Sequence, residues 1–227
     1  MLTTGNLLFN TIHMDGAYVL PDLELLGRMS GRRQRANNKL AHIKETILAE
    51  AADLVEPAAV WVRGEAEHFP FLPSKLAEPI SGVEAILGIV CTIGERLEIQ
   101  SRNYFAGQEY TRGYLLDLTG TLAVASLAQK VAEALQGQYQ ADHWAPGDDQ
   151  DDLLLDTQRL LFEVVPAHRI GVRLTEQNVM VPVKSLSFFL VIGAETRGLR
   201  CSIPCIQCVW NGMCDKRLQR SLGKSPE

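Results

Sequence analysis

The feature that most constrains the fold is a compact apolar run at residues 85–93, which ends at Gly94. The run is short and rich in β-branched side chains, which favours a strand with both faces buried rather than a helix. A strand of this kind needs other elements packed on each side. Cys91 lies inside the run, and we expect it to be a small buried core residue rather than a ligand.

Helical and extended segments are both expected along the 227 residues. From apolar spacing and turn signals, we predict helices at residues 38–55, from Glu95 onward, at 110–135 and at 152–164. Extended segments are predicted at residues 58–62, 85–93, 169–174 and 179–192. Loops are predicted at residues 70–79 and 137–152. The mixture predicts an α+β domain over residues 1–200, with a sheet flanked by helices.

The longest predicted helix carries a face with little side-chain bulk. This face is formed by Gly113, Gly120, Ala123 and Ala125. Small residues let a neighbouring strand or helix approach closely, so we expect tight packing along this face.

Four of the five cysteines lie in residues 201–227, as Cys201-x3-Cys205-x2-Cys208-x5-Cys214. The intervening loops are too short for comfortable disulfides, but they allow four sulfurs to converge on one centre. Four thiolates suit tetrahedral zinc or an iron–sulfur cluster. The first three also match the spacing of radical S-adenosylmethionine enzymes, but a fourth cysteine would fill the open iron site that such chemistry needs. We therefore predict a metal-binding tail at 201–227.

Composition excludes some functions and indicates a compartment. The net charge of -5 argues against a nucleic-acid binder, which would present a basic face. The N-terminus does not resemble a secretory signal, and no apolar run is long enough to span a bilayer. We expect a cytoplasmic protein without a membrane partner, in a compartment where thiols stay reduced and can bind metal.

Three stretches occur in the order found in one family. The first is Cys-Thr-Ile-Gly-Glu-Arg-Leu-Glu at 91–98, followed by residues 113–124, which contain Leu-Leu-Asp-x-x-Gly. The second is Trp-Ala-Pro-Gly at 144–147, with residues 157–162 downstream. The third is the stretch at 170–187. Together they resemble the activation domain of cobalamin-dependent methionine synthase, and especially the free-standing proteins similar to it. The resemblance covers roughly residues 80–217, and several such proteins also end in a cysteine cluster followed by arginine, as Arg217 follows Cys214 here.

The resemblance implies a C-shaped α+β fold with a twisted antiparallel sheet. It also implies a shallow groove for S-adenosylmethionine and a surface that caps a cobalamin module. In the family, oxidised cob(II)alamin is reduced by an electron donor and then methylated from S-adenosylmethionine. The implied partner is a corrinoid-carrying methyltransferase or a methionine synthase core, with a low-potential electron donor. This chain would then be an activation component rather than a complete methyltransferase.

Residue-by-residue transfer of the family's groove motif, Arg-x-x-x-Gly-Tyr, shows departures. The arginine falls at His143, the tyrosine at Asp148, and a further family tyrosine at Leu190. An arginine would bind the methionine carboxylate through two parallel hydrogen bonds, which a histidine cannot reproduce. These changes predict weak or absent binding of S-adenosylmethionine.

The resemblance nevertheless supplies a set of candidate cofactor contacts. They are His143, Trp144, Pro146, Gly147, Glu176 and Lys184. His143 is either an ordinary exposed or packed side chain, or an axial ligand or corrin-edge hydrogen-bond partner. Lys184 is either an anion contact or a strand lysine that extends its charge to solvent.

Two metals remain open for the tail. Zinc would fix the tail structurally, whereas a 4Fe–4S cluster could deliver the electron that cob(II)alamin needs. We favour the cluster because of this functional role, and because Trp210 and Met213 could shield its sulfurs from water. The alternative functions are an iron–sulfur electron carrier, or a non-catalytic module that binds a corrinoid protein and has structural zinc.

Overall fold

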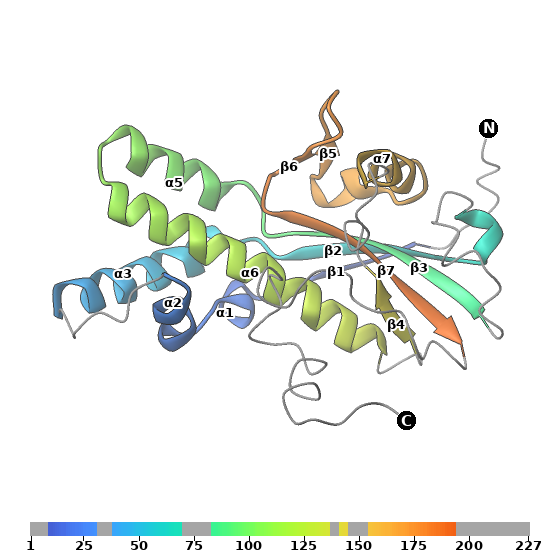
Figure 1. Ribbon diagram of the computed structural model, residues 1–227, viewed down its shortest axis with the longest axis horizontal. Coiled ribbons are helices and arrows are strands. Elements are labelled where there is room, and N and C mark those ends of the chain that lie inside the picture. The colour runs from blue at the N-terminus through green and yellow to red at the C-terminus, as the bar shows by residue number, and fades with distance from the viewer. Residues whose placement is uncertain (1–8, 31–37, 70–82, 137–140, 145–153, 194–227) are drawn as a thin grey trace.

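The computed structural model describes residues 9–30, 38–69, 83–136, 141–144 and 154–193. Its centre is a five-stranded antiparallel sheet in the order β1-β2-β3-β7-β4 (Figure 1). The strands are β1 (Phe9–His13), β2 (Ala58–Gly64), β3 (Val83–Thr92), β4 (Ala141–Trp144) and β7 (Ser185–Gly193). A separate two-stranded sheet pairs β5 (Arg173–Leu174) with β6 (Met180–Val181). The predicted α+β class with an antiparallel sheet is confirmed.

Helices cover both faces of the sheet (Figure 1). One core joins the sheet to α1 (Gly16–Val19), α2 (Leu23–Met29), α3 (Asn38–Leu54) and α6 (Tyr110–Gln136), with α5 (Arg96–Ala106) packed beside α6. The core on the opposite face contains α7 (Leu154–Val164), the 3-10 turn η2 (Ala167–Ile170) and Phe69, which follows η1 (Ala66–His68). In the described parts of the chain, no helix combines the length and apolar character that crossing a membrane requires.

Strand β3 is buried on both faces, as the apolar run predicted. Leu87, Ile89 and Cys91 lie in the core shared with α3 and α6, whereas Ile86 and Val90 lie in the core with α7. This alternation follows from the period of two along a strand. The buried surroundings raise the pKa of the Cys91 thiol to about 12, so Cys91 is an inert core residue.

Gly88 of β3 leaves a notch on the α7 face. A Cβ atom there would lie 2.8 Å from Leu161 Cδ1, 3.0 Å from Phe69 Cε1 and 3.3 Å from Val165 Cγ2. Three side chains from other parts of the chain therefore occupy the space that a side chain at position 88 would fill.

Three sequence-based expectations differ from the structure, and one 3-10 turn was not predicted. Strand β4 lies inside the predicted loop at 137–152, because its pairing with β7 creates a strand in a polar stretch with no apolar alternation. Residues 169–174 are only partly extended, since η2 occupies 167–170 and ends at Gly171, whose φ of 73° favours glycine. The extended segment at 179–192 is divided into β6 and β7. The 3-10 turn η1 was not expected either.

The N-terminal elements were not predicted, although two of them have a local signal. Asp15 caps α1 by accepting the Ala17 N–H at 2.8 Å, and Asp22 caps α2 by accepting the Leu25 N–H at 2.6 Å. Aspartate is a favoured N-cap residue because its side chain satisfies an N–H group that has no partner inside the helix. Both helices are short, which weakens their apolar periodicity.

Two residues of the predicted small-residue face of α6, Gly113 and Gly120, pack closely against α5. A Cβ atom on Gly120 would lie 2.6 Å from Leu97 Cδ2, and one on Gly113 would lie 3.0 Å from the Phe105 ring. Leu97 is fully buried and cannot move away without disturbing the core. The two glycines therefore set how closely the helices approach.

This packing predicts that Gly120→Ala is less stable than Gly27→Ala. Both glycines lie in helices, so both variants gain about 1 kcal/mol in helix propensity. Only Gly120 meets a crowded core, because the nearest atom to a Cβ on Gly27 is Lys44 Nζ at 3.7 Å. We expect a difference in unfolding free energy of about 1–3 kcal/mol from overpacking, measured by urea denaturation. Equal stabilities would contradict the tight α5–α6 contact.

Candidate functional site

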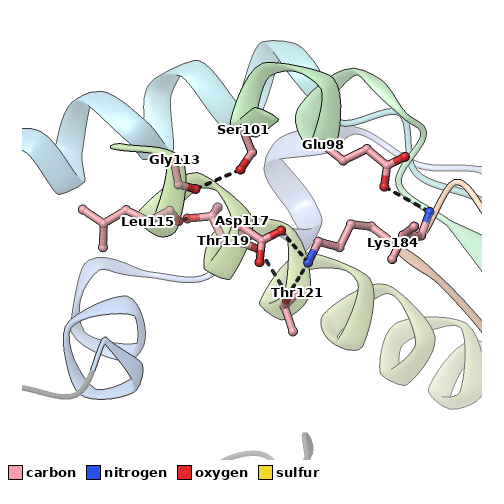
Figure 2. A network of polar contacts seen from close by, with 9 residues as sticks. Glu98, Ser101, Gly113, Leu115, Asp117, Thr119, Thr121 and Lys184 are labelled. Atoms are coloured by element: carbon pink, nitrogen blue, oxygen red, sulfur yellow. Dashed lines mark hydrogen bonds and ion pairs between the residues drawn. The ribbon is translucent and has the colours of Figure 1, made fainter. Parts of the chain in front are cut away.

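A network of polar contacts lies where the chain passes from β6 to β7, at residues 182–184 (Figure 2). Lys184 Nζ lies 2.9 Å from Asp117 Oδ1 of α6 and donates to Thr121 Oγ1 at 2.8 Å. The Lys184 side chain is 13% exposed, whereas that of Asp117 is 50% exposed. A lysine charge at this depth needs a partner, and the two contacts on α6 supply it.

Helix α5 binds the backbone of the same connection. The Val183 N–H donates to Glu98 Oε2 at 3.0 Å, and the Glu98 side chain is largely buried (Figure 2). The carbonyl of Lys184 accepts the Ile93 N–H at 3.2 Å. A backbone N–H bound to a carboxylate forms a charge-assisted hydrogen bond, which is stronger than a neutral one.

Buried hydroxyl groups complete the network at the start of β7. Ser185 Oγ donates to the Pro182 carbonyl at 2.7 Å and lies 2.9 Å from Thr92 Oγ1. Thr92 Oγ1 also accepts the Gly94 N–H at 3.1 Å. These contacts satisfy polar groups that would otherwise be buried without partners. Hydrogen bonds therefore hold both the backbone and the side chains of this connection in place.

The β5–β6 hairpin stands next to this connection and rises from the sheet between α5 and α7 (Figure 1). Its turn is closed by the Thr175 N–H to Val179 O bond at 2.9 Å and the Asn178 N–H to Thr175 O bond at 3.0 Å. On the other side, Gln158 Nε2 of α7 donates to Asn178 O at 2.6 Å. The turn therefore presents Glu176 and Val179 to solvent on a supported loop.

The structure places the described site candidates in two regions joined by β7. Glu176 is exposed at the hairpin turn. Lys184 extends toward Asp117 and Thr121 of α6 (Figure 2). His143 and Trp144 belong to the edge strand β4, opposite Leu190 and Phe189 of β7.

The other predicted residues are either buried in the core or outside the described part of the chain. Leu190, which the family comparison placed toward a ligand, is fully buried in the core on the α6 side. Pro146, Gly147 and Asp148 lie outside the described residues. The predicted ligands Cys201, Cys205, Cys208 and Cys214 also lie outside them. Within the ranges that the structure describes, no group of three His, Cys, Asp or Glu side chains is arranged to hold a metal.

Sequence reasoning missed three residues of the network, Glu98, Asp117 and Thr121. A signal existed for two of them, because Asp117 and Thr121 are four residues apart and share one face of α6. Glu98 had no comparable signal, since an isolated glutamate early in a helix is normally explained by the helix dipole. The partner of its carboxylate is the Val183 N–H, which lies 85 positions away in the sequence.

A second polar cluster joins α3, α5 and α6, where Arg112 Nη1 of α6 donates to the Tyr104 hydroxyl of α5 at 3.4 Å. The Tyr104 hydroxyl donates to Glu50 Oε2 at 2.7 Å, and Gln100 Nε2 donates to Glu50 Oε1 at 3.0 Å. Desolvation, together with the bond to Glu50, raises the pKa of Tyr104, so its phenol stays protonated and continues to donate. This cluster ties the three helices together.

The chain has the fold of a methionine synthase reactivation domain. It is similar to a solved crystal structure of the MetH reactivation domain bound to AdoHcy, with a TM-score of 0.61 over 96% of this chain and 87% of that one. The two sequences are 12% identical, so the likeness shows the fold alone. No protein-family model matches the sequence, and no curated protein matches it.

Proposed function

We propose that this protein docks on a corrinoid-carrying methyltransferase module and supports the return of cob(II)alamin to its active reduced or methylated form. The observation that carries the proposal is the reactivation-domain fold across 96% of the chain. Fold likeness alone is an analogy, and the order of the sequence motifs adds support to it. The protein would act in the cytoplasm as an activation component, with the cobalamin supplied by the partner.

The proposed docking surface contains the β5–β6 hairpin. Val179 of the hairpin and Val183 of the connection that follows it are 46% and 60% exposed. Exposed apolar side chains on adjoining segments that hydrogen bonds hold in place suit contact with a partner. His143, Trp144, Pro146, Gly147 and Glu176 are the proposed cofactor contacts. Lys184 would contribute indirectly, because its ammonium group is already bound by Asp117 and Thr121.

We also propose that the tail cysteines bind one metal centre. A 4Fe–4S cluster there would supply the electron that cob(II)alamin reduction requires. The competing functions share the cysteines and differ in the metal: an electron carrier would need the cluster, whereas a non-catalytic module would use structural zinc.

We expect the protein to accelerate reactivation of a cobalamin-loaded methyltransferase module in the presence of a low-potential donor and S-adenosylmethionine. The cobalt absorption spectrum follows the reaction. Glu176→Lys should slow it, because the substitution reverses a charge on the proposed docking surface, whereas Glu45→Lys on the exposed face of α3 should not. If the protein neither speeds the reaction nor forms a complex with a corrinoid module, the binding-module function replaces this one.

The metal proposal predicts that Cys205→Ser or Cys208→Ser removes most of the bound metal. The matched control is Cys91→Ser, which should retain it, because Cys91 is buried in the core. Iron, sulfide and zinc are assayed on protein purified without oxygen. A brown absorption that dithionite bleaches identifies a cluster, and a colourless zinc protein favours the non-catalytic module. Full metal content in both tail variants would disprove the shared site.

Binding of S-adenosylmethionine is expected to be weak or absent. Loss of a bidentate arginine contact costs about 1.5–3 kcal/mol, or roughly ten- to a hundredfold in affinity. Calorimetry with S-adenosylmethionine and S-adenosylhomocysteine measures this directly. The double variant His143→Arg with Asp148→Tyr should bind more tightly than the native protein. Micromolar binding by the native protein would mean that another group holds the carboxylate.

A further inference from the structure

The β5–β6 hairpin is attached to the rest of the fold by few polar contacts. Its strands pair with each other, and within the described residues neither strand pairs with the five-stranded sheet. Gln158 holds the turn from α7, and Met180 packs at the edge of the α7 core. On the opposite side, the hairpin continues into residues 182–184, which α5 and α6 hold through Glu98, Asp117 and Thr121.

Lys184 contributes the charged part of that attachment. Its side chain is mostly buried, so an ammonium group without a partner there would be strongly unfavourable. Asp117 and Thr121 engage the ammonium group from successive turns of α6. Moving the β6–β7 connection away from α6 would separate a largely buried charge from both acceptors. The connection is therefore held at one position on the helix.

We propose that Lys184 is a positioning residue, which tethers the β5–β6 hairpin to α6 and holds it in one orientation before a partner binds. The hairpin displays Glu176 and Val179 on the surface proposed to dock the corrinoid module, and this consequence rests on the proposed function. A surface that is already ordered loses less conformational entropy on binding. The tether thus favours docking without touching the partner's cofactor.

Hydrogen exchange in the free protein tests the tether without any partner. In Lys184→Met, which keeps the apolar part of the side chain, the hairpin amides of Thr175, Asn178 and Val179 should exchange roughly tenfold faster. Asp117→Asn should have a smaller effect in the same direction. The control is Lys130→Met, since Lys130 also lies on α6 but has its ammonium over the Tyr18 ring.

The pattern of exchange decides between a local and a global role. Faster exchange confined to the hairpin supports the tether. Faster exchange to the same extent in β3 and β7 would show that Lys184 only stabilises the whole fold, and unchanged exchange would show that the contact does not hold the hairpin. In the double variant Lys184→Met with Asp117→Asn, the hairpin amides should exchange no faster than in Lys184→Met alone. The reason is that both substitutions remove the same contact, between Lys184 and Asp117.

Binding to a cobalamin-loaded module then tests the consequence. The tether predicts that Lys184→Met binds several-fold more weakly than the native protein, whereas Lys130→Met binds normally. If the native protein does not bind, the proposed function fails, while the exchange result still decides the tether. If the native protein and a Lys184→Met variant with a loosened hairpin bind equally well, the positioning role is wrong.

Discussion

The burial of β3 and β7 on both faces is the constraint on which the rest of the structure depends. These strands are central in the sheet, so helices must cover each side. Strand β7 starts beside α5 and α6, where the backbone groups of the β6–β7 connection need partners. Glu98 accepts the Val183 N–H, Thr92 donates to the Lys184 carbonyl and Ser185 donates to the Pro182 carbonyl. The position of the start of β7 beside the packed helices therefore accounts for the polar network.

The sequence was sufficient for elements whose apolar pattern is strong and local. The run at 85–93 predicted β3 and its two buried faces, and helical spacing predicted α3, α6 and α7 to within a few residues. It was insufficient where a distant partner decides the conformation. Strand β4 forms because β7 offers an edge to Ala141–Trp144, and the break before β7 forms because helices bind Val183 and Lys184. The first cause cannot be found within its segment, whereas Pro182, which has no backbone N–H to donate, was a local sign of the second.

The candidate site was predictable to a smaller extent than the fold. The family resemblance identified residues 170–187 as important, and that stretch contains the hairpin and the connection to β7. It placed Leu190 toward a ligand, although alternation along β7 places this residue in the core. Lys184 was singled out for its charge, but its partners were not, because Asp117 lies 67 positions earlier in the sequence and only the folded chain brings the two residues together.

The notch at Gly88 has a consequence for how this sequence can diverge. Leu161, Phe69 and Val165 fill the space beside it, so four positions from three segments of the chain share one packed volume. A lineage that acquires alanine or valine at position 88 must lose volume at one of the other three to keep the same density. Aligned relatives should therefore show compensating changes in side-chain size among these four positions. Side-chain size at the neighbouring Leu87 should not correlate with them.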